Sequence, residues 1–265
     1  MSQLKKEESS HFKSINKFQN LRSDYFLSKV MNNLEKKKLL EIIKYNKKFQ
    51  KRLNISIINY KEFSENYSSI EIEIIPLENK TGRFIKISNI EDAEYYHIYF
   101  NNNKKEEIKR TNLTKKEKIS KINIIINYQI VSFNQLFSNC NCIKSINFKK
   151  LFRNNITDMS YMFDGCSALK EINFSNFNTN NVKDMSYMFW GCVSLEELNL
   201  DNFNIDNVID MSFMFDGCSS LKKLNISNFK INETTNVYKM FSGISDNLKI
   251  KIKEQFNFFK EEAFL

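Results

Sequence analysis

The chain has 265 residues, of which 42% are hydrophobic and 27% charged, so it is long enough to bury the core of one repeat domain or two modest domains. One proline and five glycines leave too few turn residues for a glycine-rich linker or a phosphate-binding loop. The formal net charge of +9 lies in residues 1–60, which hold 14 Lys or Arg against 5 Asp or Glu, and the remainder is balanced, so we do not expect nucleic acid as a partner.

The amino-terminal part divides into two segments. Residues 1–20 are polar, and we expect them to be disordered. Residues 21–60 hold apolar side chains at helical spacing, such as Leu27, Val30 and Leu34, and a second such stretch carries lysines on its other face. This pattern predicts a basic helical hairpin.

The apolar spacing of Tyr25-Phe26-Leu27, Val30 and Leu34 is similar to the skeleton of an F-box, although the usual Leu-Pro opening is absent. The resemblance implies that residues 21–55 bind a Skp1-type subunit and that the chain is a substrate adaptor of a ubiquitin ligase. The alternative is a plain helical hairpin without that partner.

Residues 61–130 have the alternation that is typical of strands. Ile70, Ile72 and Ile74 alternate with glutamates, which indicates a half-buried strand. Further strands are predicted at residues 84–87, 95–100 and 122–126. We expect this β-rich region to cap the repeats that follow, with residues 122–126 covering their open edge.

A 26-residue period dominates residues 131–255. The nonapeptides that begin at Asp158, Asp184 and Asp210 share the pattern Asp-Met-Ser-(Tyr/Phe)-Met-Phe-x-Gly-Cys. We interpret residues 131–255 as about five 26-residue units, followed by a carboxy-terminal tail at 256–265. Phenylalanine recurs in register five times, at Phe137, Phe163, Phe189, Phe215 and Phe241.

Each unit has a predicted strand and a predicted helix. The Leu-x-x-Leu-x-Leu spacing from Leu169 to Phe174 is the strand signature of a leucine-rich repeat. Asn181 and Asp184 are placed as a helix cap, and Gly191 as the residue that ends the helix. These features predict an α/β fold: a leucine-rich-repeat-like solenoid with a parallel sheet and short helices, preceded by a small helical hairpin and a β-rich capping region.

The repeat resembles a known family. The string Asn-Val-x-Asp-Met-Ser-x-Met-Phe-x-Gly-Cys-x-Ser-Leu, read from Asn181, is similar to the BspA-type leucine-rich repeats of bacterial surface proteins, mycoplasmas and protists. The resemblance covers residues 130–252 and departs at both ends, where Cys140-Asn141-Cys142 and Ile244 replace the usual residues. It implies protein binding or adhesion, and it carries no catalytic residue.

No catalytic, cofactor-binding or metal site is predicted. The cysteines are five in number, and four of them occupy one repeat position. We interpret them as buried apolar residues rather than as disulfides or zinc ligands. His11 and His97 are the only histidines, and the sequence has no motif of a known catalytic class. We therefore expect a chain without enzymatic activity and without a cofactor.

We expect the outer face of the predicted sheet to bind a protein partner of unknown identity, because this face mixes both charge signs. The alternatives are the ubiquitin-ligase adaptor and a cell-surface adhesin. Trp190 joins the candidates because exposed aromatic residues are frequent in interface hot spots. The candidate residues are Asn147, Lys149, Glu171, Asn173, Ser175, Glu197, Asn199, Asp201, Lys223, Asn225, Ser227 and Trp190.

The start of the chain has no apolar segment of the kind found in a secretory signal. No run of about 18 apolar residues occurs, so no membrane span is predicted. We expect a cytoplasmic protein, with surface display as the alternative.

Overall fold

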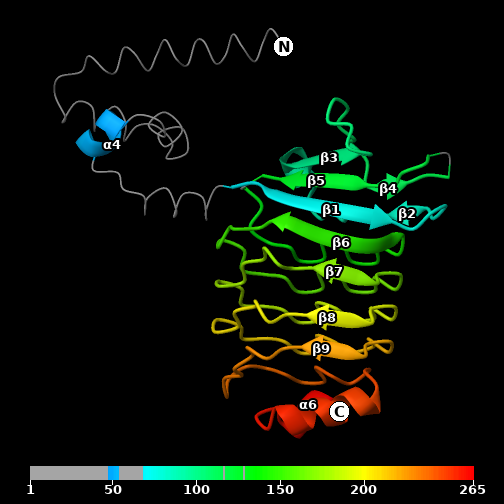
Figure 1. The fold of residues 1–265 in the computed structure, drawn as a ribbon, viewed down its shortest axis with the longest axis vertical. Helices are drawn as coiled ribbons and strands as arrows, with labels where there is room; N and C mark the ends of the chain where they lie inside the picture. Colours follow the sequence, from blue (N-terminus) through cyan, green and yellow to red (C-terminus); the bar gives the residue numbers. More distant parts are fainter. Residues whose placement is uncertain (1–46, 54–67, 116, 128) are drawn as a thin grey trace. The chain divides into compact units, whose positions relative to one another are not determined.

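The computed structural model describes residues 47–53, 68–115, 117–127 and 129–265, and the chain divides into two compact units, Met1–Tyr67 and Ser68–Leu265 (Figure 1). In the first unit the described residues form the helix α4 (Lys47–Arg52), which falls within the predicted helical hairpin. The predicted disordered segment, the rest of the hairpin and the F-box-like spacing lie outside the described residues.

The second unit contains a five-stranded sheet. Its strands are β1 (Ile70–Pro76), β3 (Tyr96–Phe100), β5 (Ile122–Ile126), β6 (Ile143–Lys150) and β7 (Glu171–Asn173). Their order is β3-β5-β1-β6-β7, as Figure 1 shows. β1 pairs antiparallel with both β5 and β6, β3 pairs antiparallel with β5, and β6 pairs in parallel with β7.

The isoleucines of the antiparallel strands form the inner face of this sheet. Ile70, Ile72 and Ile74 are at most 2% exposed, as their alternation with glutamates predicted. The expectation that residues 122–126 cover the edge of the repeats is wrong, because β1 pairs with β6 and β5 lies one strand farther away. Residues 84–87, predicted as a strand, form no strand.

Smaller elements surround the antiparallel part of the sheet. β2 (Gly82–Arg83) pairs with β4 (Asn112–Leu113) in a separate two-stranded sheet. A 3₁₀ helix, η1 (Ile90–Tyr95), leads into β3, and the side chain of Asn89 caps it by accepting a hydrogen bond from the backbone N–H of Glu91.

Beyond β7 the 26-residue units follow one another, with β8 (Glu197–Asn199) and β9 (Lys223–Asn225) in successive units (Figure 1). β8 and β9 pair in parallel in their own two-stranded sheet. In the segment that follows each repeated aspartate, every second backbone N–H donates to a carbonyl in the next unit. The donors Met159, Tyr161, Phe163 and Gly165 lie 2.7–2.9 Å from the oxygens of Asp184, Ser186, Met188 and Trp190.

The segment after each repeated aspartate is a series of turns rather than the predicted helix. Tyr161, Tyr187 and Phe213 each have a φ of 56°, in the left-handed region that a right-handed helix excludes. Between the inter-unit donors, the N–H groups of Met162 and Asp164 bond three residues back, to the carbonyls of Met159 and Tyr161 at 3.3 and 3.1 Å. Each unit therefore returns through consecutive turns.

The predicted capping residues serve these turns. The carboxylate of Asp184 accepts hydrogen bonds from the backbone N–H and the hydroxyl of Ser186, at 2.9 and 2.7 Å. Asn181 caps no helix, and its amide donates to the carbonyl of Asn154 in the preceding unit at 2.6 Å. The Asp-to-N–H bond two residues on is common to a turn and to a helix start, which is why the sequence pattern favoured a helix.

The predicted α/β fold, a leucine-rich-repeat-like solenoid with a parallel sheet and short helices, is therefore wrong. The main sheet is mixed and mostly antiparallel, and the parallel strands β7, β8 and β9 are three residues long. Within residues 68–265 as described, the helical elements are η1, α6 (Asp246–Gln255) and a 3₁₀ helix, η2 (Glu261–Phe264), and none of them lies between β6 and β9.

Phenylalanine rings fill the centre of the stacked units. Phe163, Phe189 and Phe215 are fully buried, and each ring stacks on the next at 5.4 and 5.7 Å with interplanar angles of 8° and 4°. The stack extends to Phe137 at one end and Phe241 at the other, at 5.6 and 5.8 Å. The five phenylalanines that recur at 26-residue intervals in the sequence thus form one buried column.

Residues from outside the repeat close the last unit. The N–H groups of Lys239 and Phe241, which continue the inter-unit ladder, donate to the carbonyls of Glu262 and Ala263 in η2, both at 2.7 Å. The ring of Phe264 stacks on Phe241 at 5.2 Å. The predicted tail at 256–265 therefore takes the place of one more unit.

We predict that Phe189→Ala lowers the free energy of unfolding by about 3–5 kcal/mol, because it leaves a cavity between two stacked rings. Denaturant unfolding of the purified chain, followed by circular dichroism, measures this change. A loss below about 0.5 kcal/mol, the value expected of a surface site, would contradict a buried column.

We predict that Gly243→Ala destabilises the last unit more than Ser242→Ala does. A Cβ at residue 243 would overlap the backbone nitrogen of Gly217, which cannot move aside as a flexible side chain could. The two melting temperatures provide the comparison, with an expected gap of several degrees. Equal melting temperatures would show that consecutive units are not this closely spaced.

Candidate partner-binding face

The outward side chains of β1, β6, β7, β8 and β9 form one polar surface, which we call the sheet face. Strand residues alternate between the two sides of a sheet, so the positions between the buried isoleucines and leucines point outward. Of the twelve predicted partner-binding residues, ten are exposed and two, Asn147 and Asp201, are half-buried. None of them is buried in the core.

Three of the predicted residues end the strands. The backbone N–H groups of Ser175, Asp201 and Ser227 donate to the side-chain oxygens of Asn173, Asn199 and Asn225, at 2.9, 3.1 and 3.2 Å. These turns limit each parallel strand to three residues. The Asn-x-Ser/Asp spacing in the sequence could have indicated them.

The charged side chains of the sheet face pair with one another across strands. Glu197 lies 2.6 Å from Lys223, which belongs to the next unit. Glu73 of β1 accepts from Lys149 and Lys121, at 2.6 and 2.9 Å. Burial raises the pKa of Glu73, but the hydrogen bonds from the two lysines outweigh that effect and hold its pKa below the usual value.

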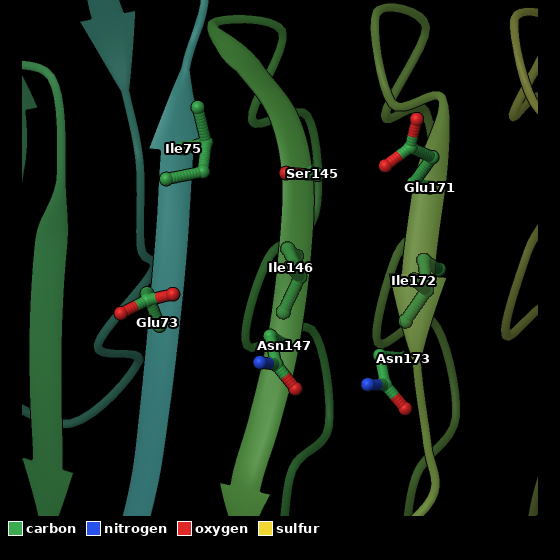
Figure 2. Close-up of a pocket in the computed structure, with 8 residues that line it drawn as sticks. All are labelled: Glu73, Ile75, Ser145, Ile146, Asn147, Glu171, Ile172 and Asn173. Atoms are coloured by element: carbon green, nitrogen blue, oxygen red, sulfur yellow. The ribbon is translucent and has the colours of Figure 1, made fainter.

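A groove of about 390 Å³ crosses β1, β6 and β7 on the sheet face. Figure 2 shows its side chains on three adjacent strands. It includes three of the predicted residues, Asn147, Glu171 and Asn173, and five that sequence reasoning missed, Glu73, Ile75, Ser145, Ile146 and Ile172.

Glu73 and Ile75 were missed for one reason. Alternation along residues 70–76 already placed Glu73 on the polar side of a strand. Nothing local indicated that this strand would lie beside β6, which is about seventy residues away in the chain, so the sequence could not join Glu73 and Ile75 to Ser145.

Trp190 lies apart from the groove, in the turn segment of its unit. Its indole N–H donates to the carboxylate of Asp216 at 3.1 Å, and the residue is 42% exposed. Nearby, the half-buried rings of Tyr161, Tyr187 and Phe213 stack at 4.6 Å spacing. The sequence prediction did not include this second column.

The chain matches the family model described as "Mycoplasma protein of unknown function, DUF285" over residues 97–254. The chain belongs to the DUF285 family. The match runs from β3 into α6, so it covers the repeats and part of the antiparallel sheet but not β1. A search of curated proteins found no match, and a search of solved structures found none.

The cysteines of this DUF285 chain are buried within the stacked units. The thiols of Cys166, Cys192 and Cys218 donate to the carbonyls of Phe137, Phe163 and Phe189 in the preceding unit, at 2.9, 3.2 and 3.1 Å. Burial raises the pKa of Cys166 and of Cys218 to about 12. These thiols stay protonated near neutral pH and fill space in the core.

Other titratable groups of the second unit are held in local contacts. His97 lies 3.0 Å from Glu107 through Nδ1 and 3.0 Å from the amide of Asn127 through Nε2. Among the described residues no group of His, Cys, Asp and Glu is arranged to hold a metal ion. No helix in the described part of the DUF285 chain is long and apolar enough to cross a membrane.

We predict that the five cysteines, all buried, resist iodoacetamide in the folded chain near pH 8 and react when the chain is unfolded. For a pKa raised from 9 to about 12, the thiolate fraction, and with it the reaction rate, falls roughly a thousandfold. Mass spectrometry after timed labelling measures this. Rapid labelling of Cys166, Cys192 or Cys218 in the folded chain would contradict the burial of these thiols between units.

The same pKa shifts set a pH dependence. Because the folded pKa is raised above the unfolded value of 9, the contribution of these thiols to stability is complete below pH 9. It is lost as the pH rises from 9 towards about 12, where the unfolded chain ionises first.

Proposed function

We propose that this chain is a non-enzymatic protein-binding module and that its partner docks on the sheet face. The observation that carries the proposal is the exposed row of polar side chains that continues from β1 and β6 through β7, β8 and β9. The outward side chains of these strands are mostly exposed, so they are the groups that a partner docking on this face meets.

The chemistry of the face supports a protein partner. It carries carboxylates and amines as well as neutral amides, with pairs such as Glu197 and Lys223 at 2.6 Å. A polyanion would favour a surface of one positive sign, whereas the polar rim of a protein interface mixes donors, acceptors and charges. The titratable groups of the face are engaged in ion pairs or exposed to water, which favours recognition over acid–base catalysis.

The repeat motif also supports protein binding by this chain. The string that begins at Asn181 resembles BspA-type repeats, and that resemblance implies protein binding or adhesion. We therefore propose that the DUF285 chain uses its repeats as BspA-type recognition units, with surface display as an alternative setting for the same binding face.

We predict that the paired substitutions Asn173→Arg and Asn199→Arg weaken partner binding more than tenfold, because they place two bulky cations at the centre of the sheet face. The partner is first captured on the immobilised full chain, and its affinity for each variant is then measured by titration. Both residues are exposed, but each substitution removes one turn hydrogen bond, so circular dichroism of the variant is compared with that of the unsubstituted chain to check that the fold is kept.

Asn247→Arg is the matched control, since Asn247 is also an exposed asparagine but lies in α6. The control should bind as the unsubstituted chain does. A partner whose affinity is unchanged by both sheet-face substitutions would refute docking on this face.

A further inference from the structure

We propose that the groove of Figure 2 takes an extended segment of the partner protein that carries a lysine or arginine, and that Glu171 binds this cationic group. The inference rests on the proposed function, because it names the partner chemistry at the same face. It depends on the order of the side chains in the groove, on their charges and on the hydrogen-bonding groups that they can offer to a ligand.

The groove has two rows of side chains that cross the three strands. In one row Ile75, Ser145 and Glu171 are register partners, and in the other row Glu73, Asn147 and Asn173 are register partners. Two residues along a strand separate the rows by about 7 Å. One row therefore ends in a carboxylate, and the other presents two amides side by side (Figure 2).

Glu171 is the carboxylate of the groove that no lysine neutralises. Glu73, the other acidic side chain, accepts from both Lys149 and Lys121. One unit later Glu197 is paired with Lys223. Glu171 takes part in none of the ion pairs found among the described residues, and it is exposed at the groove. This position has an unbalanced negative charge that a partner's cation would complement.

The row that contains Glu171 also has an apolar part. Ile75 lines the groove and is only partly buried. Lysine and arginine have long aliphatic stems that cover apolar surface while the charged end stays with a polar partner. A stem that lies over Ile75 and Ser145 runs along this row and brings its charged end to Glu171.

The amide row fits the backbone of such a segment. The side-chain oxygen of Asn173 accepts from the N–H of Ser175 at 2.9 Å, so its NH₂ group is the part that can bind a ligand. Asn147 is aligned with it on the neighbouring strand (Figure 2). Two NH₂ donors in a row match the carbonyl oxygens of an extended peptide. From there a long side chain reaches the first row, about 7 Å away.

The test is a selection of random peptides displayed on phage against the full chain, followed by titration of synthetic copies of the selected peptides. We expect the peptides to be enriched in lysine or arginine. Their affinity should fall about fivefold with Glu171→Gln and more than tenfold with Glu171→Lys. It should also weaken as salt is added. The matched control is Glu254→Gln, an exposed glutamate in α6, which should change nothing.

The remaining outcomes separate the two proposals. Peptides that lose binding with Asn173→Arg but keep full affinity for Glu171→Lys would overturn the cation site and leave the sheet face as the docking surface. If no peptide is selected, or if no selected peptide responds to Glu171→Lys, the proposal of an extended cationic segment fails, and the titration of the captured partner against the sheet-face variants decides the docking surface separately.

Discussion

The second unit depends on the backbone hydrogen bonds that join each 26-residue segment to the next. Because every second N–H from Met159 to Gly165 donates to the following unit, side chains one period apart lie against each other. Left-handed residues such as Tyr161 make this possible, since they alternate with turn residues that bond within their own unit. The period in the sequence is thus a consequence of backbone pairing, and the side chains that repeat are those that this pairing brings together.

Identical residues suit such a stack for physical reasons. Rings that face one another at 5.4–5.8 Å leave little space for a different shape, so phenylalanine recurs from Phe137 to Phe241. The same holds for the thiols, each of which donates to a carbonyl one unit back. A stack of this kind also needs an end, because its last N–H groups would otherwise lack partners. Here the carbonyls of η2 accept from the N–H groups of Lys239 and Phe241 at one end, and β1 pairs with β6 at the other end.

The sequence predicted what is repeated and local, and it failed where contacts are distant. The 26-residue period, the buried phenylalanines and the buried cysteines follow from residue type and spacing alone. The helix after Asp184 was wrong because a turn and a helix start share the same first hydrogen bond, and only the backbone at Tyr187 distinguishes them. The mixed sheet was missed because the pairing of β1 with β6 joins segments that no local pattern connects. The candidate residues proved to be outward, but the groove that collects three of them was not foreseeable.

The position of this groove suggests where selectivity arises. Within the units the column at residues 145, 171, 197 and 223 changes from serine to glutamate to lysine, so even the outward positions differ from one unit to the next. Most of their charges cancel between neighbours, as Glu197 and Lys223 do. The exception lies where β1, which follows no repeat, meets the first parallel strands. There Glu73 pairs with Lys149, and the register partner of Glu171 on β6 is Ser145, a neutral residue that supplies no cation. At the junction of the repeats with the antiparallel sheet, the serine at position 145 thus leaves Glu171 uncompensated, whereas the lysine at position 223 compensates Glu197.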